Sequence, residues 1–279
     1  MTTQVQPQDK TVSANGHNLH YLDWGAVGKP VMLLVHGLRG HAHSWDDVSA
    51  ALCDDYHVLA LDQRGRGDSD WARDGDYTTN AYVADLAAFC QALNLDRFIL
   101  VGHSMGGRNS MAFGGKYPEK LEKLVIVDVG PALDSRGSQR ISDEIRNVPE
   151  EFDSFEDVFQ HMNNQNRFAS EAVMRRRVRY STRELPNGKV GWKYDLLIRE
   201  QRRNNTVPPS DDLWPSLPNI ACPSLIVRGA ETDILAADVA QRMLETLPDS
   251  RLVEIEQAGH MVFEDNPADF IAAVKGFLG

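Results

Sequence analysis

A serine flanked by glycines stands at residues 102–106, which read Gly-His-Ser-Met-Gly. The apolar run at residues 98–101 precedes it, as a buried strand would, and a helix is expected to begin at about Met105. This order is typical of a nucleophile elbow, a sharp turn that projects the serine Oγ away from the backbone while the glycines let neighbouring segments pack closely. The free N–H groups at the helix start favour a developing oxyanion at the same point. Ser104 is therefore the candidate nucleophile.

A serine hydroxyl needs a base, and the base needs an acid that orients it. Behind a nucleophile elbow both are expected later in the chain, the acid first and the histidine last. Asp233 follows a strand predicted at residues 224–227, and His260 follows one predicted at residues 252–255. Ligands of open α/β sheets bind at the carboxyl ends of such strands. We therefore predict His260 as general base and acid, and Asp233 as the residue that orients its imidazole.

The choice of the acid has two alternatives. Glu231 lies in the same loop as Asp233, two positions earlier. Asp128 directly follows the strand predicted at residues 123–127, and a carboxylate at that strand end could also reach the histidine. Activity that survives Asp233→Asn but is lost in Asp128→Asn would overturn the choice of Asp233.

Stabilising an oxyanion requires two hydrogen-bond donors. One is expected from the backbone N–H of Met105, the residue after the nucleophile. The other is expected from the loop after the strand predicted at residues 31–35, which reads His-Gly-Leu-Arg-Gly over residues 36–40. The N–H of Leu38 is the predicted second donor, and His36 is expected to brace the loop through a hydrogen bond. Arg39 in the same loop is a candidate to bind a substrate carboxylate, because a guanidinium can pair with a carboxylate in a bidentate fashion.

Alternating strands and helices position these residues. Asn15-Gly16 between two short alternating segments predicts a β-hairpin that leads into the sheet. Continuous apolar runs predict buried strands of a parallel sheet with helices on both faces. The strands are expected at residues 31–35, 57–61, 98–101, 123–127, 224–227 and 252–255, and the helices at about 45–52, 80–93, 105–117, 236–246 and 267–277.

The middle of the chain departs from this alternation. Residues 132–218 contain no buried-strand run and many charges. We interpret them as a helical cap inserted over the carboxyl edge of the sheet. The arginine-rich run at residues 175–183 is interpreted as a solvent-exposed helix face, with steering of acidic substrates as the alternative.

Composition excludes several classes of function. The chain has 279 residues and a formal net charge of −11, which argues against a nucleic-acid-binding protein and against binding to anionic membranes. The three cysteines are widely spaced and predict neither a disulfide framework nor a zinc site. Residues 1–10 are polar, unlike a signal peptide, and no apolar stretch approaches the ~20 residues that a membrane span needs. We expect a soluble, cytoplasmic protein.

Several sequence blocks resemble the α/β-hydrolase superfamily, in the esterase-like branch of serine hydrolases with a helical cap. The matching blocks are residues 36–40, 62–70, 102–107, 228–233 and 259–260. The resemblance implies an α/β-hydrolase fold, with a mostly parallel eight-stranded sheet, helices on both faces and a cap after the sixth strand. The core would comprise residues 1–131 and 219–279, and the cap residues 132–218. By resemblance Ser104, Asp233 and His260 form the catalytic triad, Leu38 and Met105 form the oxyanion hole, and no metal or cofactor is needed.

The expected function is hydrolysis of a small-molecule carboxylic ester through an acyl-enzyme intermediate. A serine at the elbow separates this chain from the relatives that use an aspartate there, such as haloalkane dehalogenases and epoxide hydrolases. One alternative is a hydrolase that cleaves a carbon–carbon, lactone, amide or enamide bond of a small acidic metabolite, which Arg39 motivates. A second alternative is a non-catalytic ligand receptor on the same fold, which steady multiple turnover would exclude.

Overall fold

The computed structural model describes residues 5–132, 135–164 and 167–279. Residues 1–4 of the polar N-terminal segment lie outside this range, as do two short stretches of the expected cap, residues 133–134 and 165–166. Over the described residues, none of the helices combines the length and the apolar character that spanning a bilayer requires.

An eight-stranded sheet forms the centre of the molecule, with strand order β1-β2-β4-β3-β5-β6-β10-β11. The hairpin strands β1 and β2 pair antiparallel, as does β2 with β4, and the remaining neighbours are parallel. This confirms the predicted mostly parallel sheet with two antiparallel strands leading in. The strands are β1 (Gln8–Ala14), β2 (His17–Asp23), β3 (Val31–Val35), β4 (His57–Leu61), β5 (Phe98–His103), β6 (Leu121–Val127), β10 (Ser224–Gly229) and β11 (Ser250–Ile255).

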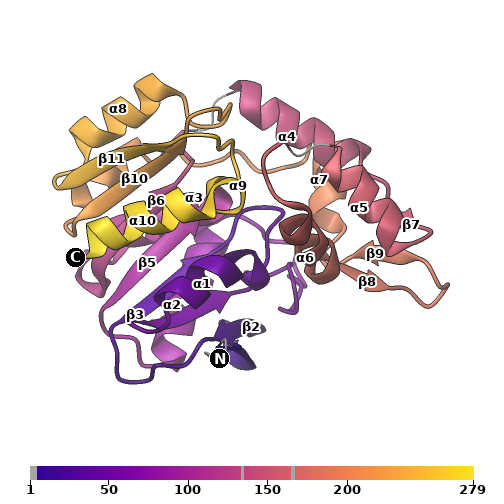
Figure 1. Ribbon diagram of the computed structural model, residues 1–279, viewed down its shortest axis with the longest axis horizontal. Helices are drawn as coiled ribbons and strands as arrows, with labels where there is room; N and C mark the ends of the chain where they lie inside the picture. Colours follow the sequence, from indigo (N-terminus) through magenta and orange to yellow (C-terminus); the bar gives the residue numbers. More distant parts are fainter. Residues whose placement is uncertain (1–4, 133–134, 165–166) are drawn as a thin grey trace.

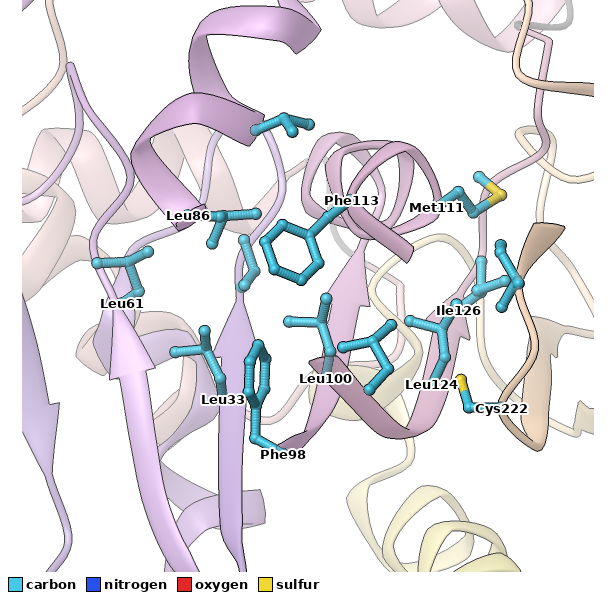
Figure 2. Packing of buried hydrophobic residues seen from close by; sticks show 14 of the residues in the cluster. Leu33, Leu61, Leu86, Phe98, Leu100, Met111, Phe113, Leu124, Ile126 and Cys222 are labelled. Atoms are coloured by element: carbon cyan, nitrogen blue, oxygen red, sulfur yellow. The ribbon is translucent and has the colours of Figure 1, made fainter. Parts of the chain in front are cut away.

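Helices cover both faces of the sheet, because alternate residues of each parallel strand point to opposite faces. On one face Leu33, Leu100 and Ile126 pack against α2 (Thr79–Ala92), α3 (Met105–Lys116) and α8 (Ala237–Thr246). Figure 2 shows this side, with Phe113 of α3 lying above Leu100. On the other face Leu34, Val101 and Val127 pack against α1 (Asp46–Leu52) and α10 (Pro267–Leu278). The buried runs predicted from the sequence are therefore covered on both sides.

An insertion between β6 and β10 gathers beyond one end of the sheet (Figure 1). It contains α4 (Ser135–Asn147), α5 (Phe155–Asn163), α6 (Glu171–Ser181) and α7 (Leu197–Arg203). A small three-stranded antiparallel sheet, order β7-β9-β8, accompanies them, formed by β7 (Glu151–Phe152), β8 (Thr182–Glu184) and β9 (Val190–Trp192). The sequence predicted a purely helical segment here, because strands of two or three residues are too short to give a recognisable period. The division into core and cap at residues 131/132 and 218/219 stays a prediction.

Candidate active site

Ser104 lies in a strained turn between β5 and α3. Its backbone is in the left-handed region, at φ 53° and ψ −118°, which is costly for any residue with a Cβ. The turn is held by hydrogen bonds from Ser104 N to the Val127 carbonyl (3.0 Å) and from Arg108 N to the Ser104 carbonyl (3.0 Å). The sharp turn requires glycine at position 106, where a Cβ would lie 2.3 Å from the Val35 carbonyl oxygen. The strand–turn–helix geometry expected for a nucleophile elbow is present.

His260 connects this serine to a buried carboxylate. Its Nε2 lies 2.9 Å from Ser104 Oγ, and its Nδ1 lies 2.8 Å from Asp128 Oδ2. The His260 side chain is 15% exposed, whereas Asp128 is fully buried. Because an ionised carboxylate only accepts hydrogen bonds, Nδ1 carries the proton and Nε2 is free to accept one from the serine. The arrangement can deprotonate Ser104 and stabilise the imidazolium that results.

The structure corrects the expected placement of Asp233. Its carboxylate faces α4 of the insertion and accepts hydrogen bonds from Arg140 Nε (2.5 Å) and Nη2 (2.7 Å), and it does not contact His260. The hydrogen bond from Arg140 lowers the pKa of Asp233. Asp128, the alternative at the end of β6, takes the place beside the histidine.

Three hydrogen bonds fix the Asp128 carboxylate in that place. Besides His260 Nδ1, it accepts from the Thr232 hydroxyl at 2.6 Å and from the backbone N–H of Gly229 at 3.1 Å. The end of the neighbouring strand β10 and the loop after it thus supply the partners that hold the acid, although the acid itself follows β6. The rival candidate Glu231 forms an ion pair with Arg167 at 2.6 Å and does not join this network.

The loop after β3 is rigidly oriented toward the serine. The Gly37 carbonyl accepts hydrogen bonds from His36 Nδ1 (2.7 Å) and from Gly40 N (3.0 Å). In a trans peptide the N–H points opposite to the carbonyl, so these two bonds also fix the direction of the Leu38 N–H. His36 therefore braces the loop, and burial lowers its pKa to about 4, which keeps it neutral.

Two backbone donors stand near Ser104 without a protein acceptor. Over the described residues, neither the N–H of Leu38 nor that of Met105 donates to another protein group. Met105 is the first residue of α3, where N–H groups have no acceptor within the helix. The loop approaches the serine so closely that a Cβ on Gly37 would lie 3.0 Å from Ser104 Cβ. This is the placement expected for an oxyanion hole.

His103, next to the nucleophile, was not among the sequence candidates for catalysis. Its Nε2 lies 2.8 Å from the backbone carbonyl of His260, and burial holds its pKa well below the ordinary value. A neutral ring with the proton on Nε2 donates to this carbonyl and anchors the loop that carries His260. The residue positions the base and does not contact the serine hydroxyl itself.

Two cavities meet at Ser104. The larger, of about 570 Å³, is lined by His260, Arg39, Arg177 and the Gly37–Leu38 segment. The smaller, of about 290 Å³, is lined by Met105, Leu38 and a mixture of apolar and polar side chains, three arginines among them. Both lie between the carboxyl edge of the sheet and the insertion. A substrate carbonyl placed at Ser104 would have room on both sides.

Arginines of the insertion and of the loop after β3 reach the larger cavity. Arg39 lines this cavity and forms an ion pair with Glu144 of α4 at 2.7 Å. Its binding of a substrate carboxylate stays a prediction. Arg177 of α6 is only 9% exposed. This corrects the interpretation of residues 175–183 as a solvent-exposed face: Arg175 is exposed, but Arg177 points inward. Sequence reasoning missed it because three consecutive arginines give no sign of which one is buried.

Within the residues that the structure describes, one group of side chains is spaced closely enough to share a cation, namely His20, Asp62 and Asp68. The Asp62 carboxylate already accepts hydrogen bonds from His20 Nδ1 (2.7 Å), Ala42 N (2.6 Å) and Asp68 N (3.0 Å). Burial would raise its pKa, but these partners lower it to about 2. The group is a hydrogen-bonded network that holds the 62–70 loop.

Comparison with known proteins gives consistent matches along the chain. The family profile described as "alpha/beta hydrolase fold" matches residues 30–267. N-formylmaleamate deformylase from Pseudomonas putida is 32% identical, with 96% of this chain and 95% of the relative covered. 3-Hydroxybutyrate-oligomer hydrolase from Cupriavidus necator is 30% identical, with 94% of each covered. The crystal structure of an alpha/beta hydrolase from Novosphingobium aromaticivorans superposes with a TM-score of 0.87 at 27% identity, covering 99% of both chains.

Proposed function

Because the chain belongs to the alpha/beta hydrolase fold family, we propose that it is a serine hydrolase that cleaves a small carboxylic ester through an acyl-enzyme on Ser104. The observation that carries this proposal is the continuous hydrogen-bond chain from Asp128 through His260 to Ser104 Oγ. This series of hydrogen bonds ends at Ser104, which lines a cavity large enough for a small molecule. A buried acid, a histidine and a serine in this order are the requirements for nucleophilic acyl transfer.

The first half of the reaction forms the acyl-enzyme. Ser104 Oγ attacks the ester carbonyl carbon while His260 Nε2 takes its proton, and Asp128 stabilises the imidazolium. The carbonyl oxygen becomes an oxyanion, which the N–H groups of Leu38 and Met105 receive. The tetrahedral intermediate then collapses, the C–O bond to the alcohol breaks, and the proton moves from His260 Nε2 to the departing oxygen.

The second half regenerates the enzyme. Water takes the place of the alcohol, His260 removes one of its protons, and the hydroxide oxygen attacks the acyl carbon. Collapse of the second intermediate breaks the bond to Ser104 Oγ, and His260 returns the proton to the serine. The carboxylic acid leaves and the enzyme is regenerated. Each cycle consumes one water molecule and one ester.

Hydrolysis of p-nitrophenyl esters of increasing acyl length tests this proposal. Wild type is compared with Ser104→Ala and with Ser13→Ala, a control at an exposed serine of β1. We expect kcat to fall by about 10⁴-fold or more in Ser104→Ala, as in other triads, and to be unchanged in the control. A Ser104→Ala enzyme that retains near-wild-type turnover would refute the proposal. Steady turnover of many equivalents by wild type would also exclude the ligand-receptor alternative.

A second candidate is cleavage of an amide, enamide, lactone or carbon–carbon bond in a small acidic molecule. The arginines that line the larger cavity favour an acidic substrate. The name of one relative, N-formylmaleamate deformylase, indicates that it removes a formyl group from an acidic amide. The same triad and oxyanion hole would serve this chemistry. Higher kcat/KM on N-acylated acidic amides than on matched esters would favour this candidate.

A further inference from the structure

The two cavities lie on either side of Ser104, so the two parts of a substrate that flank the scissile bond can occupy one cavity each. Ser104 and Leu38 line both cavities. His260 lines only the larger, and Met105 lines only the smaller. An acyl compound that reacts at Ser104 has two parts, the acyl group and the leaving group, and each cavity has room for one.

Proton transfer decides which part occupies which cavity. His260 Nε2 must give its proton to the leaving atom, so that atom lies within hydrogen-bond reach of the ring. The leaving group therefore extends into the larger cavity, beside His260. The acyl group extends into the smaller cavity, whose wall contains the apolar side chains of Val129, Ile198 and Ile234.

Arg177 gives the larger cavity a cation with unused hydrogen-bond donors. Its side chain is 10% exposed, and its buried Nε has no hydrogen-bond partner among the described atoms. Nη2 contacts only the sulfur of Met261, at 3.7 Å. Nη1 lies 3.4 Å from Glu264 Oε2, an ion pair without a short hydrogen bond. Burial raises the pKa of Glu264, which weakens this counter-charge further.

The other cations of the larger cavity are matched by acids. Arg140 pairs with Asp233, Arg167 pairs with Glu231, and Arg39 pairs with Glu144. Burial lowers the pKa of Arg39, and repulsion by the nearby Arg177 lowers it further. A buried guanidinium with unpaired donors beside a like charge is unfavourable until an anion joins it.

Each arginine of the smaller cavity donates to at least one protein oxygen, whereas Arg177 donates, within the described part of the chain, only to the Met261 sulfur. Arg66 donates from Nε and Nη1 to the Leu38 and Arg64 carbonyls and to the Tyr82 hydroxyl, and its Nη2 contacts the Met105 sulfur at 3.8 Å. Arg108 donates to three backbone carbonyls of the segment after β6 and of residue 211. Arg202 donates from Nη1 to the carbonyl of residue 198, and burial lowers its pKa to about 10, which disfavours its charged form.

We propose that the substrate carries a carboxylate on its leaving group, that Arg177 binds this carboxylate, and that the smaller cavity takes an uncharged acyl group. The proposal rests on the proposed serine hydrolase function and adds the placement of the charge. Arg177 is the specificity-determining residue in this account, and Arg39 stands next to it in the cavity wall. Products would be a neutral-chain carboxylic acid and a carboxylated alcohol or amine.

Three esters test the placement of the charge. Phenyl butyrate is neutral, 3-carboxyphenyl butyrate carries the charge on the leaving group, and monophenyl glutarate carries it on the acyl group. We expect wild type to favour 3-carboxyphenyl butyrate over phenyl butyrate by about tenfold or more in kcat/KM, as charge-assisted hydrogen bonds provide. We expect no such preference for monophenyl glutarate.

The variant Arg177→Gln tests the residue, and Arg175→Gln is the matched control on the same helix. Arg175 is exposed, pairs with Glu156 and Glu171, and does not line either cavity. We expect Arg177→Gln to lower the preference for the carboxylated leaving group by about tenfold or more, and Arg177→Lys to retain part of it. Arg175→Gln should leave the preference unchanged.

The outcomes separate this inference from the proposed function. Preference for monophenyl glutarate, lost in Arg177→Gln, would reverse the orientation and overturn the inference. Equal rates on all three esters, each abolished by Ser104→Ala, would overturn the inference and leave the serine hydrolase function standing. Turnover that survives Ser104→Ala, or hydrolysis of none of the three esters, would count against the function and the inference together. If Arg177→Gln does not fold, the ranking of the three esters by wild type still shows whether the carboxylate is preferred on the leaving group.

Discussion

Replacing Asp128 by asparagine is the perturbation that most directly separates the observed site from the one predicted by sequence. The change keeps the shape of the side chain but removes its charge. An amide nitrogen facing His260 Nδ1 would be a donor, so the ring would shift its proton to Nε2, where it can no longer accept from Ser104. The backbone N–H of Gly229 can only donate and faces Oδ1, which places the amide oxygen at that position. The amide nitrogen then takes the position of Oδ2, facing His260 Nδ1, where the Thr232 hydroxyl can turn to accept from it.

The magnitude follows from the charge that is lost. A carboxylate and an imidazolium about 4 Å apart attract by about 4 kcal/mol at an effective dielectric constant of about 20. Because each 1.4 kcal/mol or so corresponds to a factor of about ten in rate, the loss of charge alone lowers kcat by about 10³-fold. The unfavourable tautomer adds to this, and aspartate-to-asparagine changes in such triads reach about 10⁴-fold. We expect a decrease between these two values.

Steady-state hydrolysis of p-nitrophenyl butyrate measures this effect, with Asp233→Asn as the matched variant. Asp233 has a side chain that is 46% exposed and pairs with Arg140, so we expect its loss to change kcat by less than about tenfold. Thermal melting of both variants controls for unfolding. Asp233→Asn losing as much activity as Asp128→Asn, with both proteins folded, would refute the assignment of the acid.

Two further predictions concern the loop after β3 and the buried histidines. In Gly37→Ala the new Cβ would lie 2.7 Å from His103 Nδ1, so the loop must move away from Ser104; we expect kcat on p-nitrophenyl butyrate to fall by about tenfold or more, and an unchanged kcat would contradict the loop's role. Burial holds the pKa of His36 at about 4, that of His41 at about 3 and that of His103 well below 6.5. Between pH 7 and pH 5 the unfolded chain therefore binds protons that the folded chain does not, and the free energy of unfolding should fall by about 2 kcal/mol per histidine. Urea denaturation at the two pH values measures this, and equal free energies of unfolding would show that these rings are not held neutral.

The positions of Ser104 and His260 could be predicted from the sequence because both follow apolar strands, and parallel strands bring such positions to one edge. The acid could not be decided in the same way. Asp128 and the loop with Asp233 follow β6 and β10, which are neighbours in the sheet. Either carboxylate could reach the histidine by that argument. What separates them is Arg140 of the insertion, which pairs with Asp233, and the sequence does not place that helix.

The binding residues of the insertion could not be predicted from the sequence either, because the sequence does not place its helices against the core. Arg175, Arg176 and Arg177 are consecutive on α6, and successive residues of a helix point about 100° apart. Arg175 pairs with surface acids, Arg176 pairs with Asp47 of α1 at 2.6 Å, and Arg177 is buried beside the cavity. The sequence shows three consecutive arginines, but only the packing of α6 against the core determines which of their side chains lies beside the cavity.

Covalent labelling would show whether Ser104 is the nucleophile. Incubation with a fluorophosphonate should increase the protein mass by one adduct, located by peptide mapping on the segment that contains Ser104, and activity should fall in proportion to labelling. We expect no adduct in Ser104→Ala and strongly slowed labelling in Asp128→Asn. Full ester hydrolysis by completely labelled protein, or labelling at another residue that accounts for the loss of activity, would contradict this expectation.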